Sequence, residues 1–165
     1  MRKRLEKLTK RLKSEEGFTL IELMVVVMII GQLIAMSIPT FFGTRAHAQD
    51  IAARSSAARA LQTARIIYSD HATYTDATTT ALSSAEPSMV FLSATTPSTG
   101  SRVPSTDATD ATGITFISAV WSPSGNCFYI RDRTNVGVDY ARRTAGTQAN
   151  CNAANLAGIT FGTTW

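Results

Sequence analysis

Lysine is missing from nearly all of this 165-residue chain, because every lysine lies before Gly17. Residues 1–17 hold seven basic and three acidic side chains, whereas the chain from Phe18 onward holds nine arginines and nine Asp or Glu residues. The net charge of +4 therefore belongs to the first 17 residues. The neutral remainder lacks the basic patch that marks nucleic-acid-binding proteins, so no direct nucleic-acid binding is predicted.

Histidine is also scarce, and neither His47 nor His71 has neighbours with metal-ligand spacing. Asp70 and His71 are adjacent in sequence and would point in different directions on a helix. Asp107 and Asp110 lack the further oxygen ligands and the closing Glu of a calcium loop. No nucleophile, base and orienting group come together in the sequence. We therefore expect no catalytic residue, no metal site and no cofactor, and a protein that is not an enzyme.

Cysteine occurs twice, at Cys127 and Cys151. In an exported protein such a pair is most simply a disulfide, which would stabilise the fold by about 3–4 kcal/mol in the chain-entropy model. Two free buried thiols are the alternative. A structural staple is the favoured interpretation, ahead of a binding role.

One long apolar stretch dominates the N-terminal part of the chain. At about 1.5 Å rise per residue, residues 18–38 span roughly 31 Å as a helix, which matches the hydrocarbon core of a bilayer. The basic residues before it predict that this end stays in the cytoplasm and that the rest lies outside. Glu22 stands inside the stretch, where an ionised group costs about 2.5–3.5 kcal/mol and usually marks function.

Three interpretations of this stretch compete. It could be a secretory signal cut at the small-residue site Ala46–Ala48, but it is long for a signal and contains Glu22. It could be a simple membrane anchor, which leaves Glu22 unexplained. In the third interpretation, cleavage after Gly17 leaves the apolar helix as part of the mature protein.

The remaining pattern predicts an α+β fold. An Ala-rich run from Thr40 favours continuation of the helix, so we expect one helix from about Phe18 to Tyr68, transmembrane in its first half. Its second half carries a narrow apolar stripe that would pack on a small antiparallel sheet; the stripe comprises Ala57, Leu61, Ala64 and Tyr68. Pro39 and Gly43 are expected to bend or loosen the helix.

Beyond Tyr74 the sequence alternates between polar loops and short β-type runs. Residues 75–88 and 94–113 are rich in Ser and Thr and are predicted to be loops. Strands are expected where β-branched and aromatic residues cluster, at residues 89–92, 114–121, 127–130, 136–140 and, weakly, 158–161. Residues 122–126 would form the turn of a hairpin.

The segment Glu16-Gly17-Phe18-Thr19-Leu20-Ile21-Glu22-Leu23-Met24-Val25-Val26 resembles the prepilin cleavage and methylation motif of type IV pilins and the related pseudopilins. The resemblance covers about residues 13–45, including Gly31 and Pro39, which recur in the helices of that family. Beyond Tyr68 it is only architectural. The leader is longer than in many members, which bears on the subtype.

The resemblance implies a role for several residues. A prepilin peptidase would cut between Gly17 and Phe18 and methylate the new amine of Phe18. Glu22 would meet the N-terminal amine of a neighbouring subunit as it joins a filament, which would relieve two unpaired charges and fix the register. A protonated, passive Glu22 is the alternative. Gly31, Pro39 and Gly43 would form a region of helix bending, and Cys127 with Cys151 a stapled C-terminal loop.

On this basis we expect four parts: a cleaved basic leader (1–17), a transmembrane and polymerisation helix (18–39), its amphipathic continuation (40–74), and a variable loop with a sheet head and disulfide loop (75–165). The partners implied are copies of the chain, a prepilin peptidase, and a membrane assembly platform with a cytoplasmic ATPase. The subunit would wait in the membrane and then enter an extracellular type IV pilus, whose use in adhesion or motility depends on machinery encoded elsewhere. A pseudopilin of a type II secretion system and a secreted binding domain are the alternatives.

Overall fold

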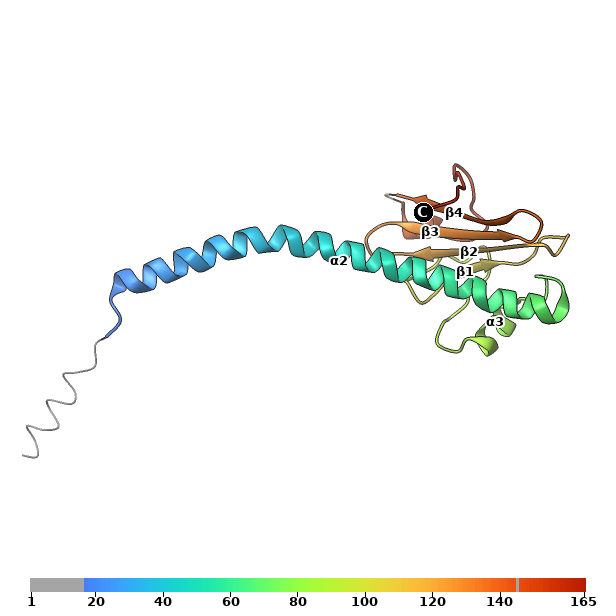
Figure 1. Ribbon diagram of the computed structural model, residues 1–165, viewed down its shortest axis with the longest axis horizontal. Coiled ribbons are helices and arrows are strands. Elements are labelled where there is room, and N and C mark those ends of the chain that lie inside the picture. The colour runs from blue at the N-terminus through green and yellow to red at the C-terminus, as the bar shows by residue number, and fades with distance from the viewer. Residues whose placement is uncertain (1–16, 145) are drawn as a thin grey trace, which may run out of the picture. The chain divides into compact units, whose positions relative to one another are not determined.

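The computed structural model describes residues 17–144 and 146–165, so the predicted leader lies outside the described residues except for Gly17. The elements (Figure 1) follow in the order α2 (Leu20–His71), α3 (Thr79–Ala85), β1 (Ser105–Asp107), β2 (Thr115–Trp121), β3 (Cys127–Arg133), β4 (Gly137–Arg143) and the 3₁₀ helix η1 (Gln148–Asn150). The chain divides between Gly43 and Thr44 into two compact units. We call the part up to Gly43 the N-terminal unit and Thr44–Trp165 the head.

Helix α2 is 52 residues long and runs through Gly31, Pro39 and Gly43. It ends three residues later than predicted, at His71, because the next residue reverses the chain. Ala72 has a φ of 58°, and its amide donates to the carbonyl oxygen of Tyr68 at 2.7 Å. This left-handed residue after the last helical turn is a common way to end a helix, although glycine is the usual residue there.

The head contains one antiparallel sheet with the strand order β1-β2-β3-β4. Its register places Ser118 opposite Ile130, and Ile130 opposite Tyr140. Each strand follows its neighbour in sequence, so hairpin connections suffice. The predicted hairpin of β2 and β3 is present, with its turn at residues 122–126.

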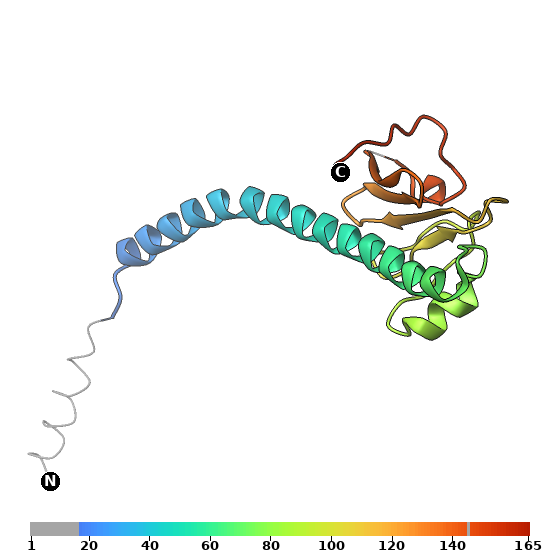
Figure 2. The ribbon, with the colours of Figure 1, turned by 45° about the vertical axis from the view of Figure 1, so that its right-hand side comes forward.

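The C-terminal half of α2 packs on one face of this sheet, which confirms the predicted α+β class. Figures 1 and 2 show this part of α2 between the sheet and α3. Small side chains on the helix allow a close approach to the larger ones of the sheet. The buried cluster contains Ala53, Ala57, Ala60, Leu61, Ala64 and Ile67 of α2, Leu82 of α3, and Phe116, Val120, Phe128 and Ile130 of the sheet.

The opposite face of the sheet is covered by the middle of residues 146–165, which we call the C-terminal segment; its last residue, Trp165, packs against the first cluster. Ile117, Ala119, Tyr129 and Ala141 project from the strands into this second cluster, and Cys151, Ala153, Leu156, Ile159 and Phe161 project from the C-terminal segment. At the edge of β4, Gly162 and Tyr140 exchange two backbone hydrogen bonds of 2.8 Å each. The sheet therefore has two buried faces.

Two of the predicted strands are wrong. Residues 89–92 contribute only an isolated bridge of Leu92 with Ser105, because the facing segment contains Pro104, which has no amide hydrogen to extend a ladder. Residues 158–161 begin inside a turn, closed by the hydrogen bond from the amide of Ile159 to the carbonyl oxygen of Leu156, in which Gly158 has a φ of 71°. Pairing begins only at Gly162.

The two predicted loops each contain an element. Helix α3 lies inside residues 75–88, and the Thr78 side chain accepts a hydrogen bond from the amide of Ala81 at its start. Strand β1 lies inside residues 94–113. Both elements are short and polar, so neither has the apolar periodicity by which helices and strands are predicted.

Candidate functional site

The predicted cleavage bond lies just before α2, between two exposed residues. Gly17, Phe18 and Thr19 precede the first helical residue, Leu20, and the Phe18 side chain is 87% exposed. Among the described residues beyond Phe18, no atom lies within 4 Å of where a Cβ on Gly17 would be. An exposed, non-helical backbone is the form in which a peptidase can bind and cut a chain.

Glu22 and Thr19 form a reciprocal cap at the start of α2. The Glu22 carboxylate accepts hydrogen bonds from the backbone amide of Thr19 at 2.9 Å and from its hydroxyl at 2.6 Å. In return, the Thr19 hydroxyl accepts the amide of Glu22 at 3.3 Å. This is a capping box, in which the first and fourth residues satisfy each other's unpaired amides.

Thr19 was not among the predicted site residues, although the sequence contains the signal for its role. A Thr followed three residues later by a Glu, immediately before an apolar run, is the sequence pattern of a capping box. Within residues 17–144 and 146–165, no cation lies within ion-pair distance of Glu22. In this part of the chain the hydrogen-bond partner of Glu22 is Thr19, and Glu22 has no charged partner.

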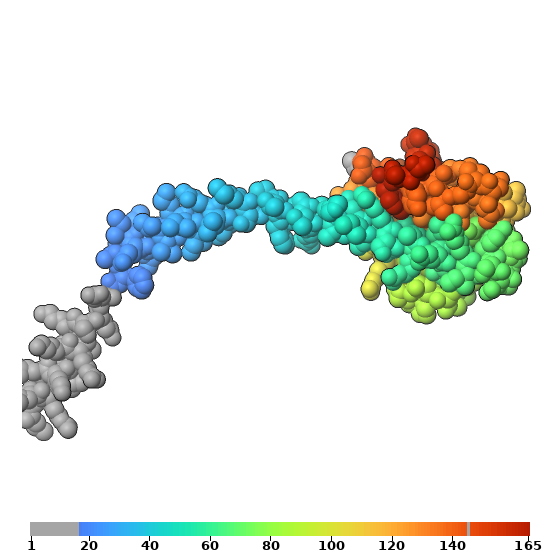
Figure 3. Space-filling view, viewed as in Figure 1, coloured from blue at the N-terminus to red at the C-terminus, as the bar shows by residue number. Residues whose placement is uncertain are grey.

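The large apolar side chains of the N-terminal unit from Phe18 to Phe42 are exposed (Figure 3). Helix α2 includes a stretch that is long and apolar enough to cross a membrane, and none of that stretch is buried within the chain. An exposed apolar surface of this extent marks contact with a membrane or with another protein. Phe41 and Phe42 close the stretch, and their ring centroids are 6.2 Å apart.

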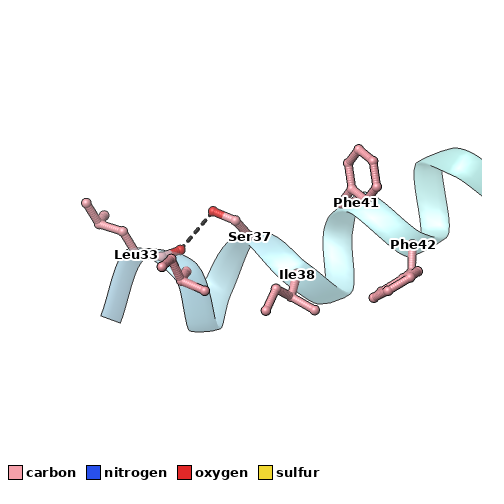
Figure 4. A pocket seen from close by; sticks show the side chains of 6 residues that line it. Leu33, Ser37, Ile38, Phe41 and Phe42 are labelled. Carbon is pink, nitrogen blue, oxygen red and sulfur yellow. Dashed lines mark hydrogen bonds between the residues drawn. The ribbon is translucent and has the colours of Figure 1, made fainter. Parts of the chain in front are cut away.

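An apolar groove lies on α2 in the same stretch of sequence as the predicted bend residues Gly31, Pro39 and Gly43, none of which lines it (Figure 4). Two rows of side chains, four residues apart within each row, form its walls; they are Leu33, Ser37 and Phe41, and Ile34, Ile38 and Phe42. Ser37 donates its hydroxyl to the carbonyl oxygen of Leu33 at 2.8 Å, and Thr40 donates to that of Met36 at 3.3 Å. Pro39 has no amide to donate to the carbonyl of Ala35, four residues earlier, so the helix ladder is interrupted there. The two hydroxyls bond to other carbonyls of the same stretch and do not replace that hydrogen bond.

In the head, Cys127 of β3 is joined by a disulfide to Cys151, 24 residues later, with 5.6 Å between their Cα atoms. Both side chains are buried in the second cluster. The loop that they close includes β4 and η1.

Two carboxylates attach α2 to the sheet. Asp50 of α2 accepts hydrogen bonds in the β2–β3 turn from Ser122 at 2.7 Å, from Asn126 at 3.0 Å and from Ser124. Partial burial opposes ionisation of Asp50, but these hydrogen bonds outweigh it and lower its pKa. At the other end of the head, the carboxylate of Asp132 in β3 accepts a hydrogen bond from the guanidinium of Arg65 at 2.7 Å and one from the hydroxyl of the buried Tyr74 at 2.6 Å.

Burial affects the pKa values of both Asp132 and Tyr74 in the second attachment. It opposes ionisation of Asp132, but the hydrogen bonds from Arg65 and Tyr74 prevail and lower the Asp132 pKa. Burial and the adjacent Asp132 carboxylate raise the pKa of Tyr74. Asp132 is thus ionised and Tyr74 neutral at ordinary pH. No local sequence pattern predicts either attachment, because the residues that they join are between 58 and 76 positions apart.

The residues weighed for metal binding or catalysis have local partners. Asp107 accepts from Thr109 at 3.0 Å and Asp110 accepts from Thr112 at 3.3 Å, both through backbone amides. His71 lies 3.2 Å from Asp76. In the part of the chain that the structure describes, no three His, Cys, Asp or Glu side chains come together as metal ligands.

Comparison with known families gives one match. Residues 12–38 match the family model described as the prokaryotic N-terminal methylation motif, which is the signature of type IV pilins and prepilins. The chain therefore carries the N-terminal motif of type IV pilin-like and pseudopilin proteins. Comparison of the chain with curated proteins and with solved structures gives no match.

Proposed function

We propose that this chain is a structural subunit of an extracellular type IV pilus, which polymerises through its N-terminal apolar helix. The observation that carries the proposal is the coincidence of the methylation motif over residues 12–38 with a helix whose large apolar side chains from Phe18 to Phe42 have no cover within the chain. A membrane can cover them before assembly, and copies of the same helix can cover them afterwards.

In this proposal a prepilin peptidase cuts between Gly17 and Phe18 and methylates Phe18. Cleavage removes every lysine and the whole net positive charge, so the mature chain is no longer held by a basic cytoplasmic flank. A membrane assembly platform with a cytoplasmic ATPase then moves the subunit into the filament. The parts are those predicted: leader 1–17, polymerisation helix 18–39, its continuation 40–74, and residues 75–165 with the sheet.

Glu22 pairs in the filament with the amine of Phe18 on a neighbouring subunit. An ion pair in an apolar core is weak evidence for net stability but a strong determinant of register, because a displaced subunit leaves both charges unpaired. Before assembly, the capping box with Thr19 supplies the carboxylate with hydrogen bonds. Assembly would therefore exchange or extend the partners of Glu22.

Pro39 carries a second part of the proposal. The helix ladder is interrupted there, and the hydroxyls of Ser37 and Thr40 bond back to carbonyls one turn earlier. We expect the helix to bend at Pro39 and Gly43, or the segment from about Gly31 to Pro39 to unwind partly, as subunits leave the membrane and pack.

The processing step is tested by mass spectrometry of the mature N-terminus. A chain that begins at N-methyl-Phe18 supports the proposal. A chain that begins at Gln49 would show cleavage of an ordinary secretory signal after Ala48 and would overturn it.

The role of Glu22 is tested with two variants that separate its charge from its cap. In Glu22→Gln, the side-chain carbonyl can still accept from Thr19 but carries no charge; in Glu22→Val, both functions are lost. We expect both variants to be processed. Both should yield at least about tenfold fewer sheared filaments than the native chain, which corresponds to a loss of about 1.4 kcal/mol in the free energy of assembly. Normal filaments from Glu22→Gln would contradict a charge-paired register.

Microscopy of the same preparations separates the pilus from the type II secretion pseudopilin. Long filaments outside the cell, with this chain as their main component, are expected for a pilus. Short assemblies confined to the periplasm would favour the pseudopilin.

A further inference from the structure

The guanidinium of Arg143, the last residue of β4, binds the backbone of the C-terminal segment. Nη1 donates to the carbonyl oxygen of Asn150 at 2.7 Å. Nη2 donates to the carbonyl oxygens of Ala157 at 2.9 Å and Asn155 at 3.2 Å, and the group lies 5.7 Å from the centre of the Tyr129 ring. Within the described residues no carboxylate forms an ion pair with Arg143. Its donors serve three main-chain oxygens of one loop and, at 3.5 Å, the side-chain oxygen of Asn155.

This arginine stands next to both ends of the disulfide. Across the β3–β4 ladder, Arg143 is the direct partner of Cys127. In the C-terminal segment, Asn150, which accepts from Nη1, immediately precedes Cys151. Arg143 therefore connects by hydrogen bonds the two stretches of chain that the sulfur atoms connect covalently.

Three further contacts of the C-terminal segment do not involve sulfur. The carbonyl oxygen of Cys151 accepts the amide of Ser98 at 2.8 Å, and the amide of Ala154 donates to Ala94 at 2.9 Å. The amide of Ala153 donates to the Ser105 hydroxyl at 3.0 Å. The path of the segment is thus specified on both sides of Cys151 without the covalent bond.

We propose that Arg143 is a non-covalent clasp that holds residues 150–157 on the sheet whether or not the disulfide is present. Hydrogen bonds from a charged donor are stronger than those between neutral groups. The planar guanidinium can address three carbonyls from one position, which a lysine ammonium on a flexible stem does less well. The disulfide then locks a loop that Arg143 already positions. This inference is independent of the filament proposal, because it concerns only contacts within the head.

Hydrogen exchange of the full-length chain in detergent micelles tests the clasp. The exchange rates measured are those of the amides of Ser98 and Ala154, whose hydrogen bonds join the C-terminal segment to residues 94–98. We compare the native chain, Cys127→Ala/Cys151→Ala, Arg143→Met, and the triple variant. The exposed neighbour Arg142 supplies the matched control, Arg142→Met in the cysteine-free chain.

In the cysteine-free chain and its Arg142→Met control, we expect both amides to exchange within about threefold of the native rates. In the triple variant we expect exchange at least about tenfold faster, because the charge-assisted hydrogen bonds are lost. Two results would overturn the proposal: free exchange in the cysteine-free chain that still has Arg143, or equal protection in the cysteine-free and triple variants.

Amides of β2 and β3 serve as the internal standard for folding. If the triple variant loses their protection as well, the decision rests on Arg143→Met with its disulfide intact. Faster exchange at Ala154 in that folded chain supports the clasp, and an unchanged rate refutes it.

Discussion

The Glu22 carboxylate has a local partner before it has a distant one. Thr19 donates two hydrogen bonds to it in the single chain, which reduces the cost of placing this side chain in an apolar environment. A neighbouring subunit that offers a positive amine must compete with or add to this cap. Thr19 is therefore as much a part of the proposed assembly site as Glu22.

Asp132 is the most consequential charge in the head. It is 3% exposed and contacts α2 through Arg65 and the chain after α2 through Tyr74. If the buried carboxylate is replaced, its donors are left without an acceptor, and if its donors are removed, the carboxylate is left buried without partners. One side chain thus joins three parts of the head.

The first prediction concerns the pH dependence of stability. Because the pKa of Asp132 is lowered in the folded chain, its stabilisation is present above the unfolded-state value of about 3.9 and is lost as the pH falls through the lower folded-state pKa. We expect Asp132→Asn to lower the free energy of unfolding at pH 7 by about 1–3 kcal/mol and to flatten the acid limb of the Tm–pH curve. Asp70→Asn, on the exposed surface of α2, is the control. An acid limb as steep as that of the native chain would contradict this role.

At the scale of elements, α2 serves two environments with one helix. Its N-terminal part is apolar on all sides, as expected for a helix covered by lipid or by other helices. In the head, small alanines face the sheet and polar residues face outward. The C-terminal segment has the corresponding role on the other face of the sheet, where it covers the second cluster and pairs with the edge of β4, which limits pairing with other chains.

The second prediction concerns the end of α2. Ala72 adopts a φ of 58°, a left-handed conformation that glycine adopts without penalty and alanine does not. We expect Ala72→Gly to raise the free energy of unfolding of the head by about 0.5–1 kcal/mol, measured by thermal unfolding in detergent.

Ala52→Gly gives the matched control, because Ala52 is exposed on the same helix but in its interior. There the same substitution should destabilise by about 1 kcal/mol. If Ala72→Gly also destabilises, the left-handed end of α2 is not the conformation in solution.

At the scale of the whole molecule, the chain is two units with opposite relations to water. The head has buried clusters on both faces of its sheet and a disulfide. The N-terminal unit exposes its large apolar side chains. Such a molecule needs a membrane, detergent or copies of itself around the first unit but not around the second.

The third prediction follows from this division. A variant that starts at Thr44 should remain monodisperse in detergent-free buffer, as measured by light scattering, because the head has its own core. Its near-UV circular dichroism should retain the signal of buried aromatic residues such as Tyr74 and Phe116, which lie 5.7 Å apart. Aggregation of this variant, or loss of that signal, would show that the head depends on the N-terminal unit.

Much of the architecture could be predicted because its signals are local. The apolar run and the alanine stripe reflect which sides of a helix are buried, and the β-branched and aromatic residues of β2 and β3 favour strands, so each signal lies in neighbouring residues. The strands predicted at residues 89–92 and 158–161 are wrong because a local signal alone does not make a strand. Their composition favours strands, but strand formation depends on a partner segment, and Pro104 and the turn at Gly158 prevent it.

The sequence alone determined the membrane-length helix, the position of Glu22 four residues after Phe18, the separation of charge at Gly17, and the α+β class, because all of these depend on neighbours along the chain. Tertiary structure decided which distant groups meet: Asp50 with the β2–β3 turn, Asp132 with Arg65 and Tyr74, and Arg143 with the carbonyls of the C-terminal segment. Such contacts join residues up to 76 positions apart. Their energy depends on distance and burial in the folded chain, which no local pattern encodes.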